Sequence, residues 1–272
     1  MSLVVNTNIA SMNAQRSLST SGRELQTAME RLSTGKKINS AADDAAGFAI
    51  AERMTAQVRG LNMAAKNAND GLSMLATIEN ATNDVTDMLH RMRELAVQAA
   101  NDTNSATDRG YIQTEVTALI AEIDRVSTDT KYNGSVVLDG SFATKKLQVG
   151  TEASQTITFS VADVDTAALS VAAVDVSTQA GAGTALTSIS AAIETVAGQR
   201  AGYGALQNRL EYTVSNLMNV SEFTQAARSR IEDADFAAES ARLSKAQVLQ
   251  QTGTAMLAQA NASQQLALSL FR

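Results

Sequence analysis

Apolar residues recur at alternating steps of four and three residues through a stretch far longer than an ordinary globular helix. The pattern runs unbroken from Met54 to Leu75 and resumes from Val85 to Leu95. This spacing places one narrow apolar stripe along an α-helix, as in helices that pack in coiled coils. Proline, which interrupts helix interiors, is absent from the chain. The sequence therefore predicts a mainly α fold of long helices in antiparallel coiled-coil packing.

Other parts of the chain repeat this spacing. The stripes are formed by Leu18, Leu25 and Leu32 near the start, by Ile112, Val116, Leu119, Ile123 and Val126, by Leu206, Leu210, Leu217 and Ile231, and by Leu249, Met256, Ala260, Ala267 and Leu270 at the end. Ser40 is predicted to cap the second helix, and Asp233 or Asp235 the last one. The N- and C-terminal helices are predicted to pair, so that Leu18, Leu25 and Leu32 meet the apolar face of residues 252–272.

The residue pattern changes near residues 131–165. Asn133-Gly134 and Asp139-Gly140 are turn dipeptides, and they adjoin short β-branched runs. One or two β-hairpins are predicted here. The following Ala-, Val-, Thr- and Gly-rich segment, through residues 179–186, is expected to be irregular, with helix returning near Ser188.

Several apolar residues near the C-terminus lie off the predicted stripe of the last helix. They are Leu257, Leu266, Leu268 and Phe271. Each Leu left in water forgoes roughly 2 kcal/mol of burial. The sequence thus predicts self-association through the two chain ends, with a polymer interface at Leu18, Leu25, Leu32, Leu249, Met256, Leu257, Leu266, Leu270 and Phe271.

Composition argues against several classes of partner. The net charge is −6, so no basic stripe is expected to bind nucleic acid. Cysteine is absent, which removes disulfides and Cys-based zinc sites. The chain contains no run of 18 apolar residues, so no membrane partner is predicted. The first residues also lack the features of a cleaved signal peptide. The expectation is a protein that is soluble or exported without a cleaved signal peptide.

Catalytic chemistry is not predicted either. His90 is the only histidine and is interpreted as a solvated helix-surface residue. Acidic pairs at Asp43-Asp44 and Glu232-Asp233 lie at predicted helix starts, where the helix dipole favours them. The sequence therefore predicts no catalytic, cofactor or metal site. Glycines inside the helical patterns, such as Gly71 and Gly253, mark either close helix approach or tolerated defects, and both interpretations stay open.

Four long segments resemble bacterial flagellin. They are MERLSTGKKINSAADDAAGFAIAERM (29–54), RGLNMAAKNANDGLSMLATIE (59–79), RMRELAVQAANDTNS (91–105) and ARSRIEDADFAAESARLSKAQVLQQTGTAMLAQAN (227–261). The resemblance covers about the first 140 and the last 75 residues. It implies a structural subunit, not an enzyme, that polymerises into the flagellar filament for swimming motility, in a short form without large variable outer domains.

The resemblance also implies a domain arrangement and partners. Residues 1–42 with 233–272 are expected to form an inner coiled-coil domain, and residues 43–232 a rod-like helical domain carrying the hairpins. The implied location is the extracellular filament, reached by flagellar type III export. The implied partners are other copies of the chain, an export chaperone, the filament cap and the hook-junction proteins.

One further partner follows from the resemblance. The segment from Leu89 to Gln98 corresponds to the site where the animal innate immune receptor binds many flagellins, and Arg91, Leu95 and Glu115 match its main positions. His90 stands where Gln is usual.

Two other functions are weighed. A hook-filament junction (hook-associated) protein shares paired terminal helices but is not expected to form long filaments alone. An enzyme or soluble binding domain would need a polar pocket, for which the sequence offers one His, no Cys and no convergent motif.

Overall fold

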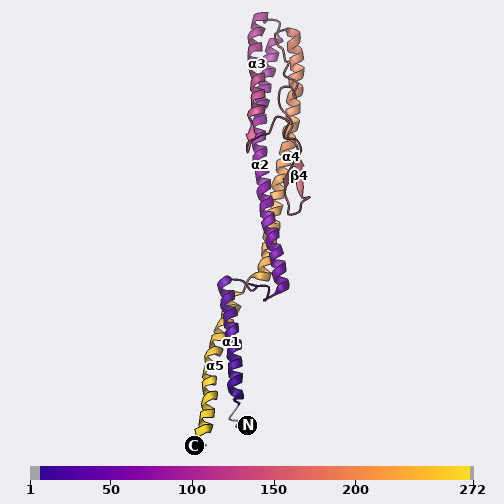
Figure 1. Ribbon diagram of the computed structural model, residues 1–272. Helices are drawn as coiled ribbons and strands as arrows, with labels where there is room; N and C mark the ends of the chain where they lie inside the picture. Colours follow the sequence, from indigo (N-terminus) through magenta and orange to yellow (C-terminus); the bar gives the residue numbers. More distant parts are fainter. Residues whose placement is uncertain (1–6, 270–272) are drawn as a thin grey trace. The chain divides into compact units, whose positions relative to one another are not determined.

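The computed structural model describes residues 7–269, with side chains through residue 263. Five helices and four short strands follow one another along this part of the chain (Figure 1). They are α1 (Ile9–Thr34), α2 (Ala45–Ala99), α3 (Ala106–Asp129), β1 (Lys131–Tyr132), β2 (Ser135–Val136), β3 (Lys145–Gln148), β4 (Thr156–Phe159), α4 (Gln179–Glu232) and α5 (Phe236–Ser269). The prediction of a mainly α fold with a small hairpin region is confirmed.

The chain packs as two compact units. A terminal unit comprises residues 1–58 and 223–272, and a central unit comprises residues 59–222. The first turns of α2 belong with the terminal helices, because Ala51 is buried there and Thr55 accepts a hydrogen bond from Arg228. The division of domains at residues 42 and 233 follows the loops between helices and stays a prediction.

In the terminal unit, α1 and α5 lie side by side and run antiparallel, as predicted for the two chain ends (Figure 1). Asn8 caps α1 by accepting from the Ser11 amide, and its side-chain amide donates to the Ala260 carbonyl across the pair. The α1 contact face contains buried Ser21 and Ala28 between half-buried leucines at Leu18, Leu25 and Leu32. Small residues at the seam let the two helix backbones approach closely.

The contact face of α5 differs from the predicted stripe. Its buried or half-buried positions are Glu239, Leu243, Ala246, Gly253, Leu257 and Ala260. These positions keep the coiled-coil spacing, but Leu249 and Met256 point away from α1. A Cβ atom at Gly253 would lie 3.2 Å from Leu18 Cδ1, so this glycine marks close approach of the helices. Leu257, predicted to lie off the stripe, is part of the seam.

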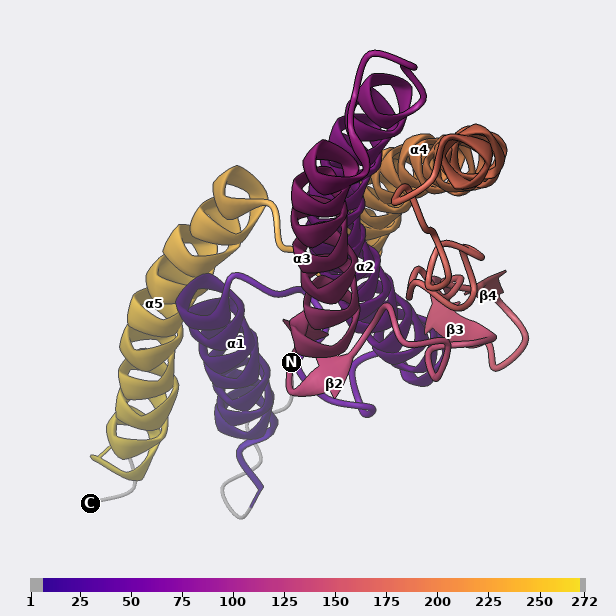
Figure 2. The same ribbon diagram turned by 90° about the horizontal axis from the view of Figure 1, so that it is seen from above.

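The central unit is built on α2, α3 and α4, and both ribbon views show α3 running beside α2 (Figures 1 and 2). The chain reverses after Ala99, where Arg109 donates hydrogen bonds to the Ala99 and Asn101 carbonyls at the end of α2. Ser105 and Asp108 form a capping box at the start of α3. Fully buried side chains from all three helices, among them Leu89, Val116 and Leu210, form the core.

Two antiparallel hairpins complete the central unit. In the first, β1 and β2 are joined by Asn133 and Gly134, both with positive φ, as the Asn-Gly dipeptide predicted. In the second, Lys145 pairs with Phe159 and Gln148 with Thr156. This hairpin lies against α2, because Leu147 packs on Gly71 and the Asn67 side chain donates to the Gln148 carbonyl.

Two helix starts differ from the predictions. Helix α4 begins at Gln179 rather than near Ser188, and the irregular chain before it contributes buried valines to the core. Helix α2 is capped by Asp44, whose side chain accepts from the Gly47 amide, and not by Ser40. Ser40 instead donates its hydroxyl to Asp43 inside the preceding turn. At the last helix, Asp235 is the cap, since it accepts from the Ala237 and Ala238 amides.

Candidate functional site

The terminal unit buries few large apolar side chains and exposes many. Between α1 and α5 the buried residues are Ser21, Ala28, Glu239 and Ala246, and only Glu239 is charged. The large apolar side chains exposed on this unit are Ile9, Met12, Met29, Phe48, Ile50, Phe223, Phe236, Val248, Leu249 and Met256. So many exposed apolar side chains on a unit that buries so few are typical of a surface that binds other protein.

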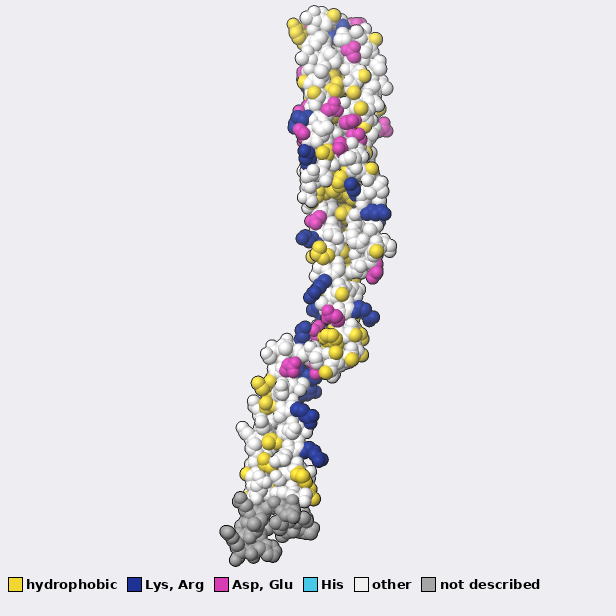
Figure 3. All heavy atoms as spheres, viewed as in Figure 1, with side chains coloured by type: hydrophobic (Ala, Val, Ile, Leu, Met, Phe, Trp, Pro, Cys, Tyr) yellow, Lys and Arg dark blue, Asp and Glu magenta, His cyan; other side chains and the backbone are white. Residues whose placement is uncertain are grey.

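One flank of α5 combines cationic and apolar residues. Four residues spaced three, four and seven positions apart lie on the same side of this helix: Arg242, Lys245, Leu249 and Met256. Leu249 is 42% exposed and Met256 is 60% exposed. From Ala246 to Phe271 the sequence contains no charged residue. The surface thus changes from basic to uncharged along α5, and Figure 3 shows hydrophobic side chains together with Lys and Arg on this unit.

A buried carboxylate lies in the seam between α1 and α5. The Glu239 side chain is 7% exposed, and its Oε1 atom accepts from Arg31 at 3.1 Å and from Arg242 at 2.9 Å. The Arg31 side chain is 18% exposed. Because the rest of the seam consists of small and apolar residues, this ion pair is the one charged contact among the described seam positions. It favours the register of the two helices in which Arg31 faces Glu239.

Replacing Glu239 with Ala is expected to destabilise the pairing of α1 and α5. The substitution leaves the largely buried Arg31 without its carboxylate, and breaking such a pair costs roughly 3 kcal/mol. Arg242→Ala is the matched control, because it removes the more exposed partner and keeps Glu239 paired with Arg31. Hydrogen exchange of α1 and α5 amides should show faster exchange in the first variant than in the second. Equal exchange in both variants would contradict this role.

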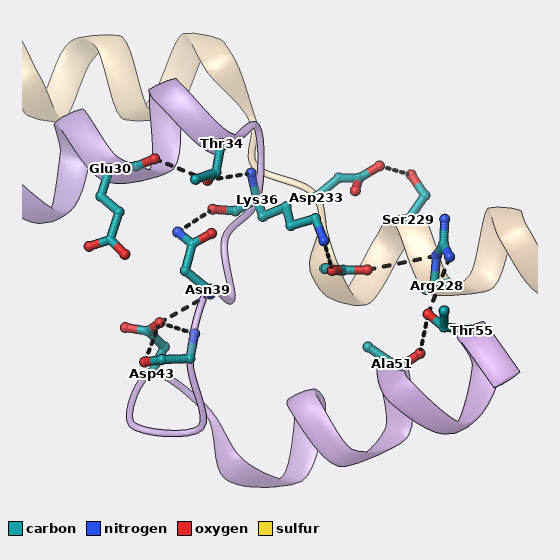
Figure 4. A network of polar contacts seen from close by, with 12 residues as sticks. Glu30, Thr34, Lys36, Asn39, Asp43, Ala51, Thr55, Arg228, Ser229 and Asp233 are labelled. Atoms are coloured by element: carbon teal, nitrogen blue, oxygen red, sulfur yellow. Dashed lines mark hydrogen bonds and ion pairs between the residues drawn. The ribbon is translucent and has the colours of Figure 1, made fainter.

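A polar network joins the two loops of the terminal unit (Figure 4). The Lys37 amide donates to the Glu232 carbonyl, and the Ala234 amide donates to the Gly35 carbonyl. The Glu232 carboxylate pairs with Lys36 and, at 3.7 Å, with Arg228. In the neighbouring turn, the Ser40 and Asn39 backbone amides donate to Asp43 and lower the pKa of that carboxyl. The α1–α2 and α4–α5 connections are thereby held to each other.

The predicted polymer-interface residues fall into three groups. Leu249 and Met256 are exposed, whereas Leu18, Leu25, Leu32 and Leu257 are half-buried in the α1–α5 seam. Leu266 lies in α5 beyond the last described side chain, and Leu270 and Phe271 lie outside the described residues. The sequence pattern missed Glu239, Arg31 and Arg242. Seven-residue spacing from Glu239 to Ala246 and Gly253 was the signal that could have identified the seam.

The residues matched to the immune-receptor site come partly together. Arg91 Nε donates to Glu115 at 2.9 Å and Arg91 Nη1 donates to Glu94 at 3.0 Å, and these exposed bonds raise the pKa of Arg91. Leu95 is only 2% exposed and belongs to the core of the central unit. The surface at this place therefore includes the Arg91–Glu115 pair but not the Leu95 side chain. His90 is exposed beside it.

The described part of the chain shows neither a metal site nor a membrane span. Residues 7–269 contain no group of three or more His, Cys, Asp or Glu side chains placed to hold a metal ion. No described helix is both long and apolar enough to cross a bilayer. The features of this molecule that suggest a function are therefore its exposed surfaces.

Comparison with known sequences decides the family. Residues 5–143 match the bacterial flagellin N-terminal helical region, and residues 186–271 match the bacterial flagellin C-terminal helical region. The chain belongs to the bacterial flagellin family. A flagellin of Halalkalibacterium halodurans is 42% identical over 272 residues, which cover 99% of this chain and all of the relative. The flagellar filament 33 kDa core protein of Treponema phagedenis is 41% identical over 286 residues, with the same coverage.

A solved flagellin structure agrees with this assignment. The crystal structure of Bacillus cereus flagellin matches with a TM-score of 0.50 and 32% identity, and it covers 56% of this chain and 88% of that one. A structure described as a flagellar hook-associated protein from Vibrio parahaemolyticus has a TM-score of 0.60 but 14% identity, covering 70% of this chain and all of that one. At such identity the second match shows the fold alone.

Family membership establishes what this flagellin does. It is a structural subunit that polymerises into the bacterial flagellar filament, and it is not an enzyme. The filament is extracellular and serves motility. Because the short relatives are aligned over their whole length, this flagellin is a short form without a large variable domain.

Proposed function

We propose that the terminal unit is the surface through which this flagellin polymerises. The observation that supports it is the contrast within this unit, where Leu249, Met256 and Ile9 are exposed while the α1–α5 seam buries mainly Ser and Ala. Contact between unlike surfaces of successive copies extends an open helix instead of closing a ring. In this proposal residues 1–42 with 233–272 form the inner domain of the filament and residues 43–232 the next domain.

The individual interface residues have different roles in this proposal. Leu249 and Met256 contact neighbouring copies directly. Leu18, Leu25, Leu32 and Leu257 act from inside the subunit, since they hold α1 and α5 together. Leu266, Leu270 and Phe271 extend the uncharged end of the chain and are proposed as further contacts. Exposed apolar area buried between copies supplies about 25 cal/mol for each Å².

Further partners are proposed from family membership. The chain is proposed to pass through the flagellar type III export apparatus without a cleaved signal peptide, with a chaperone that holds its C-terminal helix before export. At the filament tip it would meet the cap protein, and at the filament base the hook-junction proteins. Recognition by the animal innate immune receptor would use the exposed Arg91–Glu115 pair, because Leu95 is not accessible in the folded subunit.

Replacing Leu249 and Met256 with Gln is expected to weaken polymerisation. Each substitution removes about 1 to 1.5 kcal/mol of burial between copies, so with both in place the monomer concentration in equilibrium with filaments should rise roughly 30- to 150-fold. Sedimentation of filaments grown at a series of protein concentrations measures this quantity.

The matched control is the pair Met63→Gln and Met218→Gln in the central unit, where both side chains are exposed to a similar degree. These changes should alter the equilibrium monomer concentration much less. An equal rise in both pairs of variants would argue against the terminal unit as the main polymerisation surface.

A further inference from the structure

A groove lies between α1 and α5 on the terminal unit. It has a volume of about 470 Å³, and its charged lining residues are Arg23, Glu24, Arg31, Glu239, Arg242 and Lys245. Four of these side chains are cationic and two are anionic. Thr20, Thr27 and Ala28 form the rest of the lining, so most of the lining residues are charged.

The cations of this groove are not neutralised inside the subunit. Glu239 is shared by Arg31 and Arg242, so one carboxylate faces two guanidinium groups. Arg23 and Lys245 have no ion-pair partner among the described residues. Glu24 is the only other acid in the lining. The groove therefore carries an excess of two positive charges.

Polymerisation changes the environment of these charges. The groove residues Arg242 and Lys245 lie on the same flank of α5 as Leu249 and Met256, which are proposed to be buried between copies. Removing a cation from water without a compensating carboxylate is costly. A neighbouring molecule that covers this flank must therefore bring negative charge, or the cations would oppose the contact.

The charge distribution of the chain indicates where that negative charge comes from. The terminal unit has 11 basic and 9 acidic residues, a net charge of +2, whereas the central unit has 11 basic and 19 acidic residues, a net charge of −8. In a filament of one kind of subunit, the molecule facing the groove is another copy. Oppositely charged surfaces on copies of one chain select the register in which they meet.

We propose that the groove between α1 and α5 is a docking site for a carboxylate-bearing surface of a second copy of this flagellin. Arg23 and Lys245 form direct ion pairs with carboxylates of the second copy, while Arg31 and Arg242 stay paired with Glu239. The proposal rests on the terminal unit being a polymerisation surface. It adds that this surface has a charged half, which sets the register, beside an apolar half.

Zero-length carbodiimide crosslinking of filaments tests this directly, because the reagent joins an amine only to a carboxylate in direct contact. Filaments are grown from an equal mixture of ¹⁴N- and ¹⁵N-labelled protein and analysed by mass spectrometry. The expected product joins Lys245 of one isotope to an Asp or Glu peptide of the other. If Lys245 is joined only to carboxylates of its own chain, such as Glu24, or to none, the docking site is refuted. Because filaments are present in this experiment, such a result would leave the polymerisation proposal standing.

A pair of substitutions gives an independent measure. Arg23→Gln with Lys245→Gln should raise the equilibrium monomer concentration about tenfold at low salt and make it less dependent on salt concentration. The control pair, Lys66→Gln with Lys146→Gln, removes two exposed cations of the central unit. It should change the equilibrium monomer concentration less than twofold. Circular dichroism of the monomers should show equal helicity in all variants. No difference between the two pairs would overturn the proposal.

Discussion

Removing residues 253–272 is expected to abolish filament formation while the central unit stays folded. The deletion takes away Gly253, Met256, Leu257 and Ala260, so Leu18 loses the partner that packs on it. The remaining part of α5, about 17 residues, keeps only Glu239, Leu243 and Ala246 of its seam with α1. A helix of this length with so little packing is marginal in water. The distal half of the α1–α5 seam and the exposed Met256 are therefore lost together.

Sedimentation and electron microscopy measure the effect of this deletion on filaments, and thermal unfolding followed by circular dichroism measures the central unit. The central unit should keep its transition, because none of its core residues is removed. Filaments of normal length after the deletion would refute the terminal unit as the polymerisation surface. The full-length chain under the same conditions is the control.

Leu89→Ala is expected to destabilise the central unit by about 2–5 kcal/mol. Leu89 is fully buried in the core shared by α2, α3 and α4, and the substitution leaves a cavity that a packed core fills only in part. Chemical denaturation followed by circular dichroism measures the free energy of unfolding.

Val97→Ala is the matched control for Leu89→Ala, because Val97 lies on the same helix and is 53% exposed. Its effect should stay within about 0.5 kcal/mol, as for most surface substitutions. A loss below about 1 kcal/mol for Leu89→Ala would mean that this part of α2 is not the core of the central unit.

Much of the fold could be predicted because the responsible signals are local. Four-three spacing of apolar residues identified the helices, and the Asn133-Gly134 dipeptide identified the turn between β1 and β2. Spacing and turn chemistry depend on neighbours in sequence, so they need no knowledge of the tertiary structure.

The contact face of α5 was predicted incorrectly because its sequence supports two stripes. Ala, Leu and Met occur on several sides of this helix, so hydrophobicity alone favours Leu249 and Met256 over the seam that includes Glu239 and Gly253. The carboxylate at the seam is stabilised by Arg31 of the facing helix, and the glycine leaves room for Leu18 of the same helix. Neither position can be assigned to the seam without knowing these partners. Partner residues of this kind are more than 200 positions away in the sequence.

The start of α4 was missed for a related reason. Gly181 and Gly183 disfavour helix, and the local composition resembles irregular chain. The helix forms there because Ala182, Ala185 and Ile189 are buried against the core of the central unit. Tertiary packing thus outweighs the weak local propensity of this segment.

A helical reconstruction of the native filament shows directly whether α5 mediates contacts between copies. The Leu249 and Met256 side chains should each lie within about 4 Å of apolar atoms of another copy, a distance at which apolar side chains are in contact. A reconstruction with both side chains facing solvent, and with copies meeting only through residues 59–222, would contradict polymerisation through the terminal unit.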